Sequence, residues 1–319
     1  MLIDTFCRQC YNKIVARRRD LCTASPFALR GLIRRLEGHN DMKKIWIVGA
    51  SGHVGSALMK QLDCLEYELL VTDVSEVDVT NRYDVNSYMK INRPDVVINC
   101  AGLTNLDACE ADPDAAYRVN AIGARNLAME CEIAACKLIQ LSTDDVFSLT
   151  SDHPYNEFEP AHPRSVYGKS KYAGEQLVMS LSTRYVIIRS SWVYGTGSDF
   201  VSMVRDAVRT QTPLRVPINQ YGVPTSAKEL AKVVTYFIDN DLFGVYHAVC
   251  TGSCSRYEFA KEILKNIGRE IELIPVEADD SHSSYSVLDN MMLRLDHLEQ
   301  PAEWKTALAE YFKEIRGEA

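Results

Sequence analysis

Short apolar runs alternate with helical patterns along most of this chain. The runs are rich in β-branched residues and predict buried strands at 45–48, 69–72, 96–99, 138–141 and 186–189. Apolar residues at helical spacing fall between them, near 54–63, 84–91, 113–134 and 167–181. This alternation predicts an α/β fold, with a doubly wound parallel sheet covered by helices on both faces. Ligands bind at the carboxyl ends of the strands in such sheets.

The pattern is less regular after residue 195. We therefore predict a main sheet domain over 42–195 and, over 196–319, mainly a smaller C-terminal lobe. The patterns at 255–267 and 303–315 predict helices of this lobe, and 244–249 has the pattern of a buried strand that rejoins the main sheet. A cleft between two such parts is a common place for a ligand, so the lobe is expected to bind the substrate.

Composition changes abruptly at residue 42. Residues 1–41 carry a local charge of +4, which leaves −12 for the rest of the chain. Met42 leads directly into the first predicted strand, so we interpret 1–41 as an appendage that need not be ordered. A zinc site is the alternative for this segment, but it has no second close-spaced pair of ligands, and no metal site is predicted. The residues that raise the zinc alternative are Cys7, Cys10, Cys22 and His39.

The overall composition narrows the class of protein. The chain has 319 residues, 46% of them apolar, enough for one large or two medium domains. Its net charge of −8 and pI near 5.5 leave no basic field for nucleic acid. No apolar run approaches the roughly 20 residues that a membrane helix needs. The ten cysteines are scattered, several of them within apolar patterns, which predicts reduced core residues of a cytoplasmic protein.

Three regularly spaced glycines follow the first predicted strand, in the run Gly49-Ala-Ser-Gly52-His-Val-Gly55. Such glycines permit a tight turn and the close approach of a pyrophosphate, and the following helix N-terminus supplies amide donors. Asp73 ends the second strand, where a carboxylate can hydrogen-bond ribose hydroxyls and repel a 2′-phosphate, although an ordinary turn aspartate is the alternative. Asp78 and Val79 are candidates to flank adenine, although they also suit any strand-to-helix loop. The predicted dinucleotide contacts in the turn are Gly49, Ser51, Gly52, His53, Val54 and Gly55.

Tyr167 and Lys171 are four residues apart in a predicted helix. This spacing puts the phenol and the ammonium on one face, where the lysine can stabilise a tyrosinate. Lowering a tyrosine pKa from about 10 to neutrality takes roughly 4 kcal/mol. A nearby ammonium and an oxidised nicotinamide can supply that in a partly desolvated site. With Thr143 at the end of the fourth predicted strand, the pair predicts the acid–base groups of a hydride-transfer enzyme.

Further motifs occur in an order that a known family shares. From Met42 almost to its C-terminus the chain resembles an extended short-chain dehydrogenase/reductase, a family with a Rossmann-like sheet. Within it, the chain is most similar to the dTDP-4-dehydrorhamnose reductases. Several blocks in the right order are more specific than any one of them. The shared blocks are residues 49–55, 99–107, 119–121, 141–147, 167–171, 189–195, 219–225 and 285–289.

The resemblance implies roles where residues match. Thr143 takes the position of the hydroxyl that binds the substrate carbonyl, and Tyr167 that of the proton donor. Lys171 takes the position that binds the nicotinamide ribose and lowers the tyrosine pKa. The cofactor would be NADH or NADPH, with further contacts from Asn99, Ala101 and Gly102. The positions near the nucleotide sugar are Thr104, Asn120, Trp192 and Gln220. For Trp192 a core or rim aromatic is the alternative, and Asn120 either bridges the cofactor and the active-site backbone or caps local structure.

The implied reaction is reduction of the C4 keto group of dTDP-4-dehydro-L-rhamnose by NAD(P)H to give dTDP-L-rhamnose. One departure affects the substrate: residues 144–149 read Asp-Asp-Val-Phe-Ser-Leu, where the family usually has Asp-Tyr-Val-Phe-Asp-Gly. Another nucleotide-sugar reductase or epimerase therefore stays open, as does a non-catalytic NAD(P)-binding regulatory subunit. The sequence also leaves a homodimer open.

Overall fold

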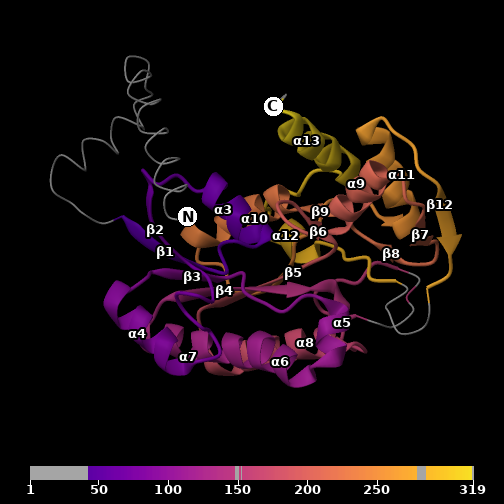
Figure 1. Cartoon of the computed structure of the whole chain (residues 1–319). Coiled ribbons are helices and arrows are strands. Elements are labelled where there is room, and N and C mark those ends of the chain that lie inside the picture. Colours follow the sequence, from indigo (N-terminus) through magenta and orange to yellow (C-terminus); the bar gives the residue numbers. More distant parts are fainter. Residues whose placement is uncertain (1–41, 148–150, 152, 279–284, 318–319) are drawn as a thin grey trace, which may run out of the picture.

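A six-stranded parallel sheet forms the centre of the protein, seen in a computed structural model that describes residues 42–147, 151, 153–278 and 285–317 (Figure 1). The strand order is β10-β5-β4-β3-β1-β2. This confirms the predicted fold class. Residues 1–41, and with them the residues considered for zinc, lie outside the described part of the chain. The strands are β1 (Lys43–Val48), β2 (Tyr67–Thr72), β3 (Val96–Asn99), β4 (Lys137–Thr143), β5 (Tyr185–Ser190) and β10 (Gly244–His247).

Helices cover both faces of this sheet (Figure 1). Because successive side chains of a strand point to opposite faces, β1 contributes to two separate cores. Ile45 and Ile47 pack with α3 (His53–Gln61) and α10 (Ala227–Asp239). Trp46 and Val48 pack with α4 (Arg82–Asn92), α7 (Ala124–Ala134) and α8 (Val166–Leu181) on the other face. Helix α10 packs on the sheet although it follows residue 195, so the chain returns to the sheet more than once after that residue, first with α10 and then with β10.

The helix predicted over 113–134 is divided in three. It consists of α6 (Pro113–Tyr117), a π-helical stretch over Arg118–Gly123 and α7. Asn120 lies in the π-helical stretch and is buried. Its side-chain amide accepts a hydrogen bond from the Leu103 N–H and donates one to the Leu103 carbonyl oxygen. Short π-helical stretches of this kind are frequent at functional sites. The preceding short helix is α5 (Leu106–Ala111), and a 3₁₀ turn over Asp144–Val146 follows β4.

The outer lobe has its own apolar core beside the sheet domain (Figure 1). Aromatic side chains dominate this core, with Phe259 in ring contact with Trp192, Tyr194, Phe200 and Trp304. No helix in the described residues has both the length and the apolar character that crossing a bilayer requires. The lobe's helices are α9 (Phe200–Thr210), α11 (Arg256–Ile267) and α13 (Trp304–Arg316), while α12 (Met291–Leu295) packs on the sheet. Its short strand pairs are β6 (Val193–Tyr194) with β9 (Thr225–Ser226), β7 (Leu214–Pro217) with β12 (Leu273–Val276), and β8 (Tyr221–Gly222) with β11 (Cys254–Ser255).

Candidate active site

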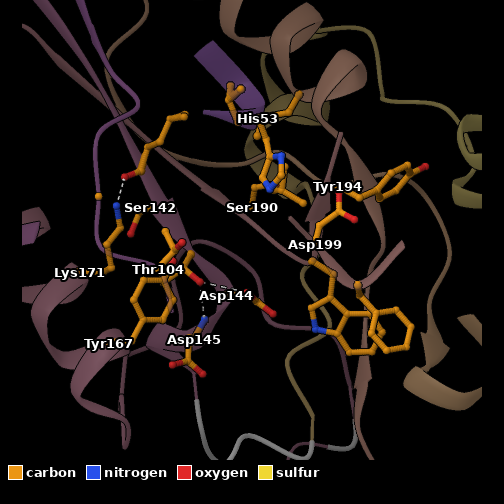
Figure 2. A pocket seen from close by; sticks show the side chains of 18 of the residues that line it. His53, Thr104, Ser142, Asp144, Asp145, Tyr167, Lys171, Ser190, Tyr194 and Asp199 are labelled. Atoms are coloured by element: carbon orange, nitrogen blue, oxygen red, sulfur yellow. Dashed lines mark hydrogen bonds between the residues drawn. The ribbon is translucent and has the colours of Figure 1, made fainter. Parts of the chain in front are cut away.

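A pocket of about 460 Å³ opens at the carboxyl ends of the central strands. Residues after β1, β3, β4 and β5 form its sheet side, and α9, α11 and Ser286 close it from the outer lobe. Figure 2 shows Lys171, Tyr167 and Thr104 along one side of the pocket, with His53, Tyr194 and Asp199 facing them. The pocket therefore lies where an open parallel sheet binds ligands, between the two parts of the molecule.

The glycine turn forms one end of this pocket. Gly49 has φ +74°, a conformation that favours glycine, and a Cβ at Gly55 would come within 2.5 Å of the Gly49 carbonyl oxygen. Gly52, His53 and Val54 line the pocket, whereas Gly49, Ser51 and Gly55 shape the turn outside the lining. The His53 ring nitrogen Nδ1 lies 2.6 Å from the Thr196 carbonyl oxygen, which ties α3 to the loop after β6.

Asp73 is held against the glycine turn rather than in the pocket lining. Its carboxylate accepts a hydrogen bond from the Ser51 backbone N–H, with Oδ2 at 3.1 Å. This places an acidic group at the rim where the predicted adenosine ribose would lie. Asp78 and Val79 lie outside the lining as well: the Asp78 carboxylate accepts from the Thr80 N–H, and Val79 is buried in the core between sheet and α7.

We predict that Asp73 favours NADH over NADPH. Asp73→Asn keeps an acceptor for the Ser51 N–H but removes the negative charge that would repel a 2′-phosphate. The ratio of kcat/KM for NADPH to that for NADH should rise about tenfold, equivalent to about 1.4 kcal/mol. Steady-state kinetics with both cofactors measures it. An unchanged ratio would show that Asp73 does not approach the ribose.

Thr143, Tyr167 and Lys171 all line the same pocket. Thr143 is the last residue of β4, and helix α8 begins with Ser165 as N-cap, whose hydroxyl accepts from the Gly168 N–H at 2.9 Å. This cap starts the helix just before the tyrosine. The Lys171 ammonium is buried and donates to the Leu141 carbonyl oxygen at 2.7 Å. The structure thus brings together the three groups that the sequence predicts to be catalytic.

The electrostatics of Tyr167 differ from the sequence expectation. Burial raises the pKa of Tyr167 above its ordinary value, a hydrogen bond with Thr143 lowers it, and the Asp144 and Asp145 charges raise it further. The expected lowering of this pKa by Lys171 is therefore not supplied by the protein's own charges, because the acidic neighbours act on the phenol and the ammonium is bound to Leu141. A raised pKa still suits a proton donor, since the phenol keeps its proton through neutral pH.

The loop after β3 forms the next part of the wall, with Ala101, Gly102 and Thr104 in the lining. The buried side-chain amides of Asn99 and Asn120 bind the backbone of this loop on the side away from the pocket. The Asn99 side chain accepts from the Ala101 N–H at 3.1 Å. Asn120 accepts from the Leu103 N–H at 2.9 Å and donates to the Ser170 hydroxyl on α8. Asn99 and Asn120 thus lie outside the lining and connect this loop to the sheet and to the helix that carries Tyr167.

Asp144 joins three segments at the floor of the pocket. Its Oδ2 accepts from Ser191 after β5 at 2.8 Å and from Ser286 of the C-terminal segment at 2.5 Å. Burial raises the pKa of Asp144, although these hydroxyls oppose the shift. Asp145, one of the departures from the family pattern, lines the pocket and accepts a hydrogen bond from the Ser165 hydroxyl. The other departures, Ser148 and Leu149, lie outside the described residues.

The predicted sugar contacts Thr104, Trp192 and Gln220 also line the pocket. Several lining residues were not predicted, above all Arg256 at the start of α11. No local pattern marks it, because it is the first residue of an ordinary amphipathic helix. Among the described residues no three His, Cys, Asp or Glu side chains gather as a metal site requires. The other lining residues that the prediction missed include Ser142, Ser190, Tyr194, Asp199, Phe200, Phe259 and Ser286.

Comparison with known proteins gives the family. Residues 42–316 match the RmlD substrate binding domain family. The chain is similar to a solved dTDP-4-dehydrorhamnose reductase from Clostridium acetobutylicum, with 39% identity and a TM-score of 0.83 over 86% of this chain and 99% of that one. A Bacillus anthracis dTDP-4-dehydrorhamnose reductase in complex with NADP has 35% identity and a TM-score of 0.83, over 85% and 99% of the two chains. The spore coat polysaccharide biosynthesis protein SpsK of Bacillus subtilis is 35% identical over 86% of this chain and 98% of that protein. The chain therefore belongs to the RmlD substrate binding domain family.

Proposed function

We propose that this protein reduces the C4 keto group of dTDP-4-dehydro-L-rhamnose with NADH or NADPH and forms dTDP-L-rhamnose. The observation that carries the proposal is the meeting of Thr143, Tyr167 and Lys171 in one pocket beside the glycine turn. Relatives named dTDP-4-dehydrorhamnose reductase, similar along nearly their whole length, support the substrate. A binding scaffold would have no need for a proton donor in its pocket.

The residues present fit a dinucleotide. An added Cβ at Gly49 would lie 2.8 Å from the Ala101 backbone nitrogen, and one at Gly102 would lie 3.2 Å from the Asn120 Oδ1. Side chains are therefore excluded at both glycines, which lets the loops after β1 and β3 pack closely, as the close backbone approach of a dinucleotide requires. The first turn of α3 offers amide donors for the pyrophosphate. When bound, the reduced nicotinamide supplies the hydride.

The protein's own residues then orient the ketone and supply the proton. The Thr143 hydroxyl and the Tyr167 phenol both face the pocket, where they can bind and polarise the C4 carbonyl oxygen. Tyr167 gives its proton to this oxygen as negative charge develops there. Lys171, held by the Leu141 carbonyl, is placed to bind a ribose hydroxyl beside the phenol. The outer lobe excludes water through Trp192, Phe200 and Phe259, which line the same pocket.

The direct test supplies the purified protein with dTDP-4-dehydro-L-rhamnose and follows the absorbance of NADH or NADPH. We expect stoichiometric oxidation of the cofactor and formation of dTDP-L-rhamnose. If only another 4-keto nucleotide sugar is reduced, the reaction class stands and the named sugar is wrong. A protein that purifies with tightly bound NAD and shows no net oxidation is instead an epimerase.

We predict that the pH dependence of kcat/KM reflects the titration of the Lys171 ammonium. Burial lowers the pKa of Lys171 to about 8, and the Glu175 carboxylate opposes this shift. If the ammonium form binds the ribose, kcat/KM is full below this pKa and falls as pH rises through about 8. The phenol does not explain such a fall, because burial raises its pKa. Lys171→Arg, which stays charged, should keep only part of the activity but lose the fall near pH 8. A fall that persists in Lys171→Arg would assign it to another group.

A further inference from the structure

Arg256 presents an unused set of hydrogen-bond donors to the pocket. It is the first residue of α11, and its guanidinium carbon lies 3.4 Å from the centroid of the Trp192 ring and 4.9 Å from that of Phe200. Stacking of this kind occupies the face of the guanidinium, whereas its N–H donors point outward in the plane. Within the described part of the chain, this guanidinium has no hydrogen bond or ion pair.

The charge of Arg256 is not neutralised by contact with the protein. Burial lowers the pKa of Arg256 to about 10, so the side chain stays charged at neutral pH. The nearest opposing charge is Asp144, which raises this pKa but directs its carboxylate to the Ser191 and Ser286 hydroxyls. A partly desolvated cation without an ion pair is costly, and an anionic ligand would offset that cost.

The backbone restricts the position of the Trp192 ring on which Arg256 stacks. Trp192 has φ +43°, which is uncommon for a residue with a side chain. Its indole lies against Gly222, where an added Cβ would come within 2.4 Å of the Cε2 atom. Two backbone donors in the first turn of α11 are already occupied: the Glu258 N–H donates to the Ser255 hydroxyl and the Arg256 N–H to the Gln220 carbonyl oxygen. An anion at this end of the helix would therefore be bound chiefly by the guanidinium.

We propose that Arg256 binds the diphosphate of the nucleotide-sugar substrate. The inference rests on the proposed function for the identity of the ligand. Arg256 lines the same pocket as Thr143 but enters it from α11 of the outer lobe, whereas Thr143 ends strand β4 of the sheet. In a pyranose the anomeric oxygen lies across the ring from C4, and the diphosphate therefore begins one ring width from the Thr143 hydroxyl. The planar guanidinium fork matches phosphate oxygens in a bidentate arrangement.

The cofactor's pyrophosphate is the other anion that the pocket would receive, and it has a separate place. It would lie at the N-terminus of α3, over the sheet, whereas α11 belongs to the outer lobe (Figure 1). Of the Lys and Arg side chains that line the pocket, Lys171 is bound to the Leu141 carbonyl, which leaves Arg256 for the substrate.

Calorimetric binding of nucleoside diphosphates tests this in the presence of NADP⁺. The wild type is titrated with dTDP, UDP and GDP, and the tightest of them is compared with its nucleoside. Arg256→Gln should weaken the diphosphate about 10- to 100-fold, as expected for loss of a charge-assisted hydrogen bond. Affinity for the nucleoside and for NADP⁺ should stay the same. The diphosphate affinity of Arg256→Lys should lie between those of the wild type and Arg256→Gln, because an ammonium keeps the charge but lacks the paired donors of a guanidinium. Arg215→Gln, an exposed arginine on β7 of the same lobe, is the matched control and should change nothing.

Equal diphosphate affinity in wild type and Arg256→Gln overturns the inference, as does equal weakening of the nucleoside, which would mean a general loss of pocket structure. Failure of all three diphosphates to bind the wild type also overturns it. The reduction assay decides the proposed function separately. If the wild type reduces the ketosugar and Arg256→Gln binds the diphosphate as tightly as the wild type, only the proposed role of Arg256 is wrong. If the wild type reduces no ketosugar but Arg256→Gln binds the diphosphate more weakly, only the proposed reaction is wrong.

Discussion

Tyr167→Phe should lower kcat for ketosugar reduction by about a hundred- to ten-thousand-fold, because it removes the proposed general acid. The phenyl ring keeps the shape of the pocket wall, so the Kd of NADPH or NADH should change by less than about twofold. The raised pKa of Tyr167 means that the wild type holds its proton through neutral pH, which makes the loss independent of pH in that range. Stopped-flow or steady-state oxidation of the cofactor measures kcat, and fluorescence titration measures Kd.

The matched control is Tyr172→Phe. Tyr172 lies five residues along the same helix α8 and packs against the core of the outer lobe, outside the pocket lining. We expect it to retain most of the wild-type turnover. A Tyr167→Phe enzyme that keeps more than half of the wild-type kcat would remove Tyr167 from the mechanism, whatever the effect of the control.

Glu175→Gln should lower the free energy of unfolding by about 3–5 kcal/mol, because it leaves a buried arginine without its counter-ion. Glu175 lies one turn after Lys171 on α8 and accepts hydrogen bonds from two guanidinium nitrogens of Arg189 on β5, with Nη2 to Oε2 at 2.7 Å. It also accepts from the Ser142 hydroxyl at 2.5 Å. Both charged side chains are buried, so water cannot replace the lost carboxylate. Urea denaturation followed by circular dichroism measures the change.

An exposed ion pair provides the comparison. Lys228 of α10 contacts Glu314 of α13 with both side chains about two-fifths exposed, and such pairs are worth about 0–1 kcal/mol. Lys228→Gln should therefore change stability by less than about 1 kcal/mol. If Glu175→Gln is equally mild, the ion pair between α8 and β5 does not stabilise the layer beneath the active site.

The main elements of the sheet domain follow from local patterns in the sequence. The five runs that predict strands each coincide with a strand, and β3 agrees residue for residue at 96–99. This succeeds because a strand buried on both faces must be apolar throughout, and a helix on such a sheet must be apolar on one side. The short strands of the outer lobe were not predicted, since two-residue pairs such as β6 and β9 leave no periodicity to detect.

The sequence predicts site residues most directly where one stretch of backbone carries the chemistry. The glycine turn requires residues without side chains at fixed spacing, and one helical turn brings Tyr167 and Lys171 to the same face of α8. Both requirements can therefore be recognised within a short segment of sequence. For Asn120 the sequence left open a contact in the site or a local cap, and in the structure it lies behind the pocket wall, bound to the Leu103 backbone. A π-helical stretch that no propensity marks gives it that position.

The sequence by itself thus determined the sheet, the glycine turn and the helix that carries Tyr167, because periodicity and backbone requirements are local. Tertiary structure alone decided which distant residues meet there. It brought Ser286 to Asp144, stacked Arg256 on Trp192 and placed Tyr167 where burial and the charges of Asp144 and Asp145 raise its pKa. The physical reason is that the hydrophobic pattern of an element records that one face is buried but not which partner covers it. Charges and hydrogen bonds then depend on that partner, so the electrostatics of this site exist only in the packed molecule.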